Sequence, residues 1–376
     1  MIRLLFAVPL MIHGLIHLMG FSKEWNLGPP SMLKRKTTIP LTVAAAKIAG
    51  LLWLFACLLL IGTAVLYLEQ KDWYWMVGIV GVGLSQVLII LYWHDAKYAT
   101  LLNIILLAVM ILSSAQSNFD KSVDREVSAM VHASASVSPA VASSRRADLP
   151  PVVQKWLTTS GAFDKPVSVI RVEQSGRMRT APDGKWMDFQ ATQFCTIDPP
   201  AFVWKARIDA MPLLFIDGRD KYENGKGHML IKLLAAYTMA NASGNEIDQG
   251  TLLRFMGEMI WYPEAAIMEY LRWEEIAPDQ ALATMTYKGV TATGTFTFHP
   301  NGSVKCFSAE RFGDFQGEFR KEIWQVDVAG YKKMGDRQIP FACEVTWKLK
   351  SGDFMWLKQE ITDIEYIEGK QLKSIR

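Results

Sequence analysis

Two groups of polar side chains in this 376-residue sequence have the types and spacing that could support chemistry. In the larger group, Arg254 and Glu258 lie four residues apart in a stretch of helical periodicity, so they can pair on one helix face. Four more polar residues surround a predicted turn nearby: Asp217, Arg219, Asp220 and His228. The second group is a histidine pair, His13 and His17, inside an apolar run.

The larger group has two interpretations. In the first, Glu258 is a carboxylate in a cavity, held by Arg254, and His228 acts as an acid or base. In the second, Arg254 and Glu258 form an ion pair that fixes a helix on a sheet, as structural ion-pair networks do. Because the two interpretations compete, no catalytic residue is assigned, Glu258, His228 and Arg254 stay candidates, and enzymatic activity is left open. The candidate ligand-binding residues of this region are Arg219, Asp220, Arg254, Glu258 and Trp261.

The histidine pair also has two interpretations. His13 and His17 share one helix face because they are four residues apart. That spacing could chelate one metal ion or serve a proton relay, but it could not place both axial ligands of one haem. The alternative is that the imidazoles form hydrogen bonds between membrane helices. Other polar residues recur at similar depth in the neighbouring apolar runs, where such groups usually face the bundle interior: Lys47, Gln86 and Asn103.

Several functional classes lack their sequence signals. There is no GxSxG, HExxH, Walker A or GxGxxG motif, so no cofactor is predicted. No concentrated basic segment predicts a nucleic-acid partner. None of the four cysteines has CxxC spacing, which disfavours a zinc ribbon or a thioredoxin-like site. One disulfide among Cys195, Cys306 and Cys343 is compatible with a domain outside the cytoplasm, and the sequence does not select the pair.

The elements that must position the histidines are four apolar runs, each long enough to span a bilayer: residues 4–21, 41–68, 73–93 and 99–115. Backbone polar groups cannot stay unpaired in lipid, so we expect these runs to be α-helices. The third run is bracketed by aromatic residues, as an interfacial belt would be. The first run lacks a small-residue cleavage site, which favours a membrane helix over a signal peptide.

The distribution of basic residues predicts an orientation. The first connecting loop holds Lys23, Lys34, Arg35 and Lys36, whereas the second holds only Lys71. The positive-inside rule then places the first and third loops in the cytoplasm, with the N-terminus and everything after residue 116 outside. The sequence therefore predicts a multi-pass protein of the bacterial inner (cytoplasmic) membrane, with the lipid bilayer as its partner and an extracytoplasmic C-terminal domain.

The region after the fourth run changes composition. Residues 118–131 could form a short amphipathic helix, and the Ala/Ser-rich tract that follows has little to bury, which is typical of a flexible tether. We therefore expect a transmembrane domain at 1–115, a flexible linker at 116–147 and an antiparallel β-rich domain at 148–376.

The C-terminal region has the pattern of an α+β domain. Apolar and polar residues alternate in four segments, 187–195, 202–208, 290–298 and 341–349. Residues 167–179 are a further strand candidate, and about ten strands are expected in all. Helical patterns occupy 151–159, 228–240 and 250–262, and another helix starts at Pro263. A twisted antiparallel sheet must cover its apolar face. The predicted fold class is a four-helix transmembrane region plus a curved, half-barrel-like antiparallel sheet covered by helices, a shape that often leaves an apolar cavity.

Several segments resemble an uncharacterised bacterial membrane-protein family, known as a domain of unknown function: 13–21, 95–103, 149–153, 218–227 and 253–263. The resemblance covers nearly the whole chain and implies no activity. The strand and helix pattern is also similar in outline to the periplasmic lipoprotein-carrier fold, a half-barrel with an apolar cavity. That similarity implies a fold and not a function.

These observations favour a membrane-anchored envelope protein whose outer domain binds a lipid or another apolar small molecule. Two alternatives stay open: an envelope enzyme that uses Glu258 and His228, and an intramembrane metal or proton site at His13 and His17. The sequence predicts neither a protein partner nor an oligomeric state.

Overall fold

The computed structural model describes residues 2–27, 37–134, 145–162, 166–315 and 317–368. The chain divides into two compact units, Met1–Asp120 and Lys121–Arg376. Most of the Ala/Ser-rich tract of the predicted linker, residues 135–144, lies outside the described residues.

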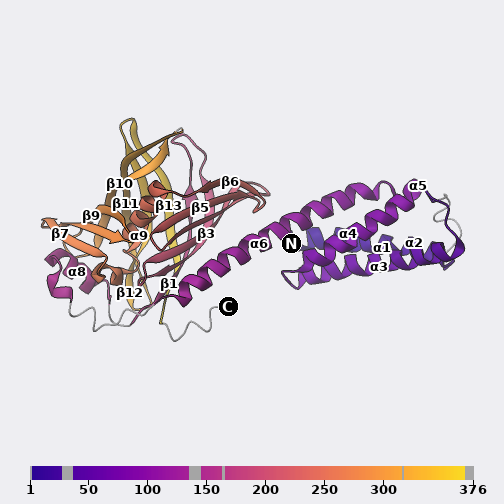
Figure 1. Ribbon diagram of the computed structural model, residues 1–376, viewed down its shortest axis with the longest axis horizontal. Coiled ribbons are helices and arrows are strands. Elements are labelled where there is room, and N and C mark those ends of the chain that lie inside the picture. The colour runs from indigo at the N-terminus through magenta and orange to yellow at the C-terminus, as the bar shows by residue number, and fades with distance from the viewer. Residues whose placement is uncertain (1, 28–36, 135–144, 163–165, 316, 369–376) are drawn as a thin grey trace. The chain divides into compact units, whose positions relative to one another are not determined.

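The first unit consists of apolar helices (Figure 1). Its helices are α1 (Ile2–Ile16), α2 (Leu18–Glu24), α3 (Val43–Leu68), α4 (Tyr74–Leu91), α5 (Trp93–Ala96) and the first part of α6 (Ala99–His132). Four segments are long and apolar enough to cross a membrane: Phe6–Glu24, Val43–Leu68, Tyr74–Leu91 and Ala99–His132. The four predicted apolar helices are thus confirmed.

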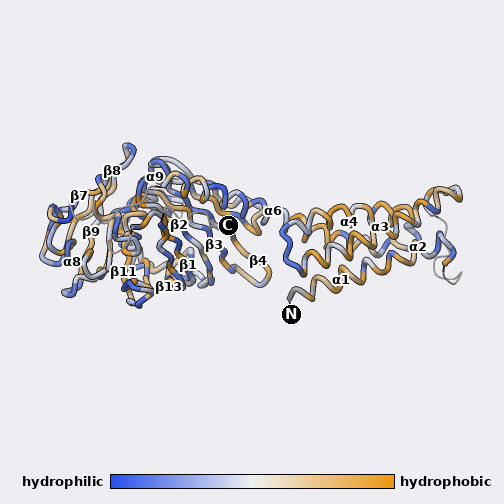
Figure 2. Tube along the Cα trace, turned by 90° about the horizontal axis from the view of Figure 1, so that it is seen from below, coloured by the Kyte–Doolittle hydropathy of each residue, from blue (hydrophilic) through white to orange (hydrophobic). Residues whose placement is uncertain are grey.

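Small residues let these helices pack closely, while large apolar side chains face outward. A Cβ atom on Gly20 would lie 2.5 Å from the Trp53 ring, and one on Gly78 would lie 2.6 Å from the Met110 sulfur. Such close approach is typical of helix pairs in membranes. Val43 and Leu101 are 78% and 67% exposed. Figure 2 shows that hydrophobic residues dominate α1, α3 and α4.

The helix α6 continues beyond the fourth predicted span. It includes the segment 118–131 for which an amphipathic helix was predicted, and the predicted apolar residues Val123, Val127 and Met130 are buried. The residues of α6 from Lys121 onward belong to the second unit.

The second unit is built on one antiparallel sheet of thirteen strands in the order β6-β5-β4-β3-β2-β1-β13-β12-β11-β10-β9-β8-β7. The first six strands are β1 (Val169–Met178), β2 (Met187–Thr196), β3 (Ala201–Met211), β4 (Leu214–Glu223), β5 (Lys226–Leu233) and β6 (Tyr237–Ala242). The other seven are β7 (Leu271–Ala277), β8 (Gln280–Tyr287), β9 (Val290–Phe298), β10 (Val304–Phe315), β11 (Glu318–Met334), β12 (Arg337–Leu349) and β13 (Gly352–Ile367). The predicted fold class is confirmed.

Short helical elements accompany this sheet. They are η1 (Arg146–Asp148), α8 (Pro151–Thr159), α9 (Asn245–Glu258) and η2 (Pro263–Ile267). The helices predicted at 151–159, at 250–262 and from Pro263 correspond to α8, α9 and η2. The helix α9 packs against β4 and β5 in one half of the sheet and against β9 and β10 in the other half. The sheet therefore bends around α9 (Figure 1), and we call the face that contacts α9 the inner face.

One predicted helix is wrong. Residues 228–240 are mostly the hairpin of β5 and β6, not a helix. Every side chain from His228 to Leu233 is half-buried, so the alternation that marks a strand with one wet face is absent. The turn is formed by Leu234 and Ala235, at φ 52° and 55°, where a tight hairpin usually has Asn or Gly. Neither the strand signal nor the turn signal was visible in the sequence.

Candidate functional site

Charged and polar side chains gather where α9 lies on the inner face. Strand register places Gln193, Trp204, Asp220 and Met229 side by side across β2 to β5. Successive residues of a strand point to opposite faces, so this row shares the face that α9 covers. The last two turns of α9 deliver Arg254 and Glu258 to the same row.

Arg254 is the centre of this cluster. Its Nε donates to Glu258 Oε1 at 2.7 Å, its Nη1 to Asp220 Oδ2 at 2.7 Å, and its Nη2 to Gln193 Oε1 at 3.0 Å. The guanidinium carbon also lies 4.9 Å from the ring centroids of both Phe202 and Trp204. All three nitrogens are bonded, so Arg254 is held in place by α9, by β4 and by β2.

Two glutamines extend the cluster to the centre of the sheet. Gln193 Nε2 donates to Glu258 Oε2 at 2.6 Å, so each oxygen of that carboxylate accepts a hydrogen bond. Gln174 Nε2 lies 3.4 Å from Gln193 Oε1, and Gln174 Oε1 accepts from Trp204 Nε1 at 2.9 Å. Hydrogen bonds and the stacking of Arg254 on Trp204 thus form a closed ring of five side chains: Arg254, Glu258, Gln193, Gln174 and Trp204. We call these five residues and Asp220 the inner-face cluster.

The inner-face cluster is largely shielded from solvent. The side chains of Arg254, Asp220 and Glu258 are 14%, 15% and 12% exposed. Two opposite charges in such a place stabilise each other only when both are hydrogen-bonded, and here both carboxylates are bonded to Arg254. The i,i+4 ion pair of the structural interpretation is therefore present, with a third ionic partner that it did not include.

The cysteines near this cluster are poor nucleophiles. Burial and the neighbouring Glu258 carboxylate raise the pKa of the Cys195 thiol, and the same two causes raise the pKa of Cys343 to about 12. A thiol that stays protonated at neutral pH does not attack. All four cysteines are free thiols, so the disulfide considered from the sequence is not formed.

The predicted polar group is divided between the two faces of the sheet. Asp220 points to the inner face, whereas its neighbour Arg219 pairs on the outer face with Glu126 of α6, at 3.1 Å from Nε to Oε2. Arg219 also donates to His228 Nδ1 at 2.8 Å, and His228 Nε2 contacts Asn241 Oδ1 at 2.6 Å. The structure therefore does not bring His228 and Glu258 together.

Two other residues that were singled out from the sequence, Asp217 and Trp261, lie away from the inner-face cluster. Asp217 pairs with Arg207 on the outer face at 3.2 Å. Trp261 is 1% exposed in the core, and its Nε1 donates to the carbonyl oxygen of Pro340 at 2.9 Å.

Beyond the inner-face cluster, the inner face becomes apolar in two steps. The next row across the strands has small residues, Ala191, Ala206 and Gly218, and Trp204 Cζ3 would lie 3.5 Å from a Cβ atom on Gly218. The row after it is large and apolar: Phe189, Ile208, Ile216 and Leu233. Several apolar side chains of this part of the face are only half-buried: Met178, Met187, Trp204, Ile216, Leu233 and Phe315.

Sequence reasoning missed one cation on this face. Arg311 of β10 is half-buried, its Nε donates to the Gly250 carbonyl oxygen at 3.2 Å, and its guanidinium lies 4.8 Å from the Trp324 ring centroid. No spacing rule links Arg311 to Arg254, because only the packing of α9 on β10 brings the two residues near each other. The only sequence signal is an arginine at an inward position of an alternating strand.

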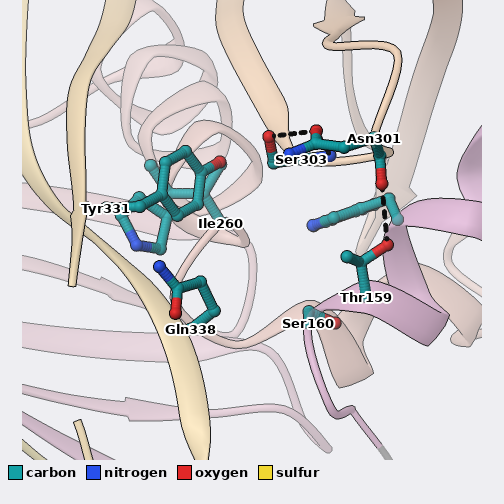
Figure 3. Close-up of a pocket in the computed structure, with 9 residues that line it drawn as sticks. Thr159, Ser160, Ile260, Asn301, Ser303, Tyr331 and Gln338 are labelled. Atoms are coloured by element: carbon teal, nitrogen blue, oxygen red, sulfur yellow. Dashed lines mark hydrogen bonds between the residues drawn. The ribbon is translucent and has the colours of Figure 1, made fainter. Parts of the chain in front are cut away.

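A separate small cavity of about 140 Å³ lies between the C-terminal end of α8, the β9–β10 turn and strands β11 and β12 (Figure 3). Its lining is mixed, with Trp156, Ile260 and Tyr331 beside Ser160 and Gln338. Ligand pockets usually measure about 300 to 1,000 Å³, so this cavity is too small for a lipid chain.

The histidine pair of the helical unit lies in a hydrogen-bonded chain. His13 Nε2 contacts Asn103 Oδ1 at 2.9 Å. His17 Nδ1 donates to the His13 carbonyl oxygen at 2.7 Å, and its Nε2 accepts from Ser85 Oγ at 2.8 Å. Asn103 Nδ2 also donates to Gln86 Oε1 at 3.1 Å. Both ring nitrogens of His17 are therefore occupied, and a metal ion would have to displace one of these bonds.

The described residues contain no group of three or more His, Cys, Asp or Glu side chains that could hold a metal ion. Lys47, the remaining polar residue singled out in the apolar runs, lies over the Trp25 ring, 5.6 Å from its centroid.

Comparison with known proteins gives one family. The profile of a family described as "Family of unknown function (DUF6544)" matches residues 139–359. The predicted resemblance to a family without a known function is confirmed. No curated protein matched the chain.

Three solved structures have a similar fold, each with 10% sequence identity. A LolA superfamily protein from Nitrosomonas europaea has a TM-score of 0.35, covering 58% of this chain and 92% of that one. A putative outer membrane lipoprotein-sorting protein domain from Vibrio parahaemolyticus has a TM-score of 0.31, with 62% and 95% covered. A DUF1329 family protein from Desulfovibrio piger has a TM-score of 0.35, covering 57% of this chain and 91% of that one. This likeness agrees in outline with the predicted resemblance to the lipoprotein-carrier fold, and it assigns no ligand to this chain.

Proposed function

We propose a function for this chain, which belongs to the family of unknown function DUF6544, because the profile of that family spans more than half of it. The chain is a membrane-anchored envelope protein whose β domain binds a lipid or another apolar ligand on its inner face. The observation that carries the proposal is the composition of that face. Half-buried apolar side chains, among them Ile216 and Met187, lie on the same face as a cluster of ions that is largely shielded from solvent.

The inner face has the two parts that recognition of an amphiphilic molecule needs. When a ligand covers half-buried apolar side chains, the free energy of the complex is lowered by about 25 cal/mol per Å² of apolar surface removed from water. The charged end of the same face is preorganised by the hydrogen bonds of Arg254. The 140 Å³ cavity beside α8 is too small, so the ligand lies along the inner face beside α9.

The membrane part of the proposal rests on the helical unit. Four helices have the length and hydropathy of membrane spans, and large apolar side chains such as Val87 are exposed on their outer surface. A soluble protein rarely exposes so many apolar side chains over a contiguous surface. The basic first loop supports an inner-membrane location with residues 148–376 outside the cytoplasm.

The ligand part is tested on the full chain, purified in a non-ionic detergent and analysed for co-purified lipids by native mass spectrometry. Ile216→Glu places a charge on the half-buried inner face and should reduce lipid occupancy at least about tenfold, because the ligand would have to bury that carboxylate. Ile323→Glu is the matched control, since Ile323 is a 39%-exposed isoleucine on the outer face of β11.

Wild-type protein that carries no lipid and takes up none from added lipid would refute the binding proposal. An equal loss of lipid occupancy in Ile216→Glu and Ile323→Glu would refute the assignment of the lipid site to the inner face. Orientation is tested separately, with a C-terminal alkaline phosphatase fusion that should be active and a C-terminal green fluorescent protein fusion that should be dark. The reverse result would place the domain in the cytoplasm.

A further inference from the structure

We propose that Arg311 binds the anionic group of the ligand, so that the inner face selects apolar molecules that carry a carboxylate or a phosphate. This inference rests on the proposed function, because it names the chemical class of the ligand. It also predicts that the anionic end of the ligand lies beside α9, where Arg311 contacts Gly250.

The contacts of Arg311 fix its position without neutralising it. Its Nε is bonded to the Gly250 carbonyl oxygen, and the ring of Trp324 lies beside the guanidinium. A Cβ atom on Gly250 would lie 3.4 Å from Arg311 Nε, so the absence of a side chain there leaves room for this approach of β10 to α9. The two Nη groups of Arg311 have no hydrogen-bond acceptor among the described residues.

The nearby carboxylates are already used. Asp220 and Glu258 each bond to Arg254 at 2.7 Å. Glu322 lies directly opposite Arg311 across β10 and β11, but its carboxylate bonds to Arg320 Nε at 2.7 Å. No carboxylate oxygen of the described residues forms an ion pair with Arg311 within 4.0 Å.

An unpaired cation in this place is unfavourable for the ligand-free protein. Burial lowers the pKa of Arg311 to about 10. The Asp220 and Glu258 carboxylates raise this pKa and the Arg254 guanidinium lowers it further. The side chain is therefore still charged at pH 7, and the two carboxylates, which are bonded to Arg254, only partly offset its desolvation. An anion that binds there removes this cost, whereas a neutral molecule does not.

The surroundings of Arg311 suit a molecule with both an anionic and an apolar part. A planar guanidinium with free Nη groups matches the two oxygens of a carboxylate or a phosphate. Farther along the same face lie Trp347 and Phe315, whose ring centroids are 5.2 Å apart. The Trp347 ring would also lie 3.1 Å from a Cβ atom on Gly313 of β10. These groups offer apolar contact to a hydrocarbon chain next to the charge.

The test compares charged and neutral probes with the same tails on the detergent-solubilised full chain, by equilibrium dialysis. Oleate against oleyl alcohol tests a carboxylate, and dioleoyl phosphatidate against dioleoylglycerol tests a lipid phosphate. Arg311→Gln should weaken binding of the anionic probe roughly 10- to 100-fold and leave the neutral probe within about twofold. Arg311→Lys, which keeps the charge but not the planar fork, should retain part of the preference.

The thermal midpoint is a second readout, because the loss of a structural arginine would lower it, whereas the loss of a ligand-binding arginine would not. Removing a half-buried cation that has no ion-pair partner among the described residues should leave the thermal midpoint of the ligand-free protein unchanged or raise it. Arg171→Gln is the matched control: Arg171 is a 38%-exposed strand arginine on the outer face, and its loss should leave both probes unaffected.

Four outcomes would overturn the inference. If wild type binds charged and neutral probes equally, or if Arg311→Gln keeps the preference, Arg311 is not the anion site, although lipid binding stands. If Arg311→Gln lowers the thermal midpoint and weakens all four probes alike, Arg311 is a structural residue. If wild type binds none of the four probes, the proposed function fails together with this inference.

Discussion

The helical unit and the sheet unit each bury a polar cluster, but they use different chemistry to do so. The helical cluster contains neutral groups, among them His17, Ser85 and Asn103, which join α1, α4 and α6 by hydrogen bonds. The inner-face cluster contains ions, with Arg254 between Asp220 and Glu258.

The two kinds of cluster differ in the free energy that is lost when one partner is removed. A neutral hydrogen bond between membrane helices contributes only about 0.5 to 2 kcal/mol, because unfolded helices in a membrane also find partners. An ion that loses its partner inside a water-soluble domain costs about 3 to 5 kcal/mol. The helical cluster should therefore tolerate single losses, whereas the inner-face cluster should not.

The largest expected effect is at Arg254. Arg254→Met keeps the length of the side chain but leaves Asp220 and Glu258 without their cation, and should lower the free energy of unfolding by about 3 to 5 kcal/mol. Urea unfolding followed by tryptophan fluorescence measures it, and Arg171→Met on the outer face should cost no more than about 1 kcal/mol.

A compensating variant sharpens that test. The triple variant Arg254→Met, Asp220→Asn, Glu258→Gln removes the unpaired charges and should recover part of the loss. If the triple variant is less stable than Arg254→Met alone, unpaired charge is not the cause of the destabilisation.

A smaller effect is expected in the helical unit. Asn103→Ala removes the bonds to His13, Ser85 and Gln86 and should cost about 0.5 to 2 kcal/mol, measured by unfolding in mixed detergent micelles. Ile104→Ala, at a neighbouring position that is 60% exposed, is the control and should cost less. A cost for Asn103→Ala as large as that for Arg254→Met would remove the contrast between the two clusters.

The smallest effect is expected at the edge of the inner-face cluster. Trp204→Phe keeps an aromatic ring under Arg254 but loses the bond to Gln174, which should cost about 0.5 to 1.5 kcal/mol. Trp356→Phe is the matched control, because the Trp356 Nε1 is buried without a hydrogen-bond partner in the described structure. Equal costs for the two variants would show that the Gln174 bond adds nothing.

The parts of the fold that sequence predicted well are those with a strong local signal. The apolar runs have the length of membrane helices, and part of β3 alternates between buried and exposed side chains, from Ala206 to Asp209. The hairpin of β5 and β6 was missed because both of its faces are partly covered and its turn uses Leu234 and Ala235 in place of Asn or Gly. Tertiary contacts determined this hairpin, and they leave no periodic trace in the sequence.

The site divides in the same way. Arg254 and Glu258 could be paired from sequence because one helix sets their spacing. Gln193, Asp220 and Arg311 come from three strands that are distant in sequence, and only the register brings them to α9. Alternation along β4 and β5 also separates Arg219 and His228 from Asp220, which proximity in sequence could not reveal.

The order of the strands has a consequence for how this domain is made. Strands β1 and β13 are the first and last to be synthesised, yet they pair in the middle of the sheet, with Val169 opposite Ile367. Each half can form as a series of hairpins, but the pairing of β1 with β13 must wait until β13 has been synthesised, and distant pairings of this kind form slowly. A nascent chain halted before Gly352 would leave two long strand edges open, so premature termination should yield a sticky, protease-sensitive product and not a smaller working domain.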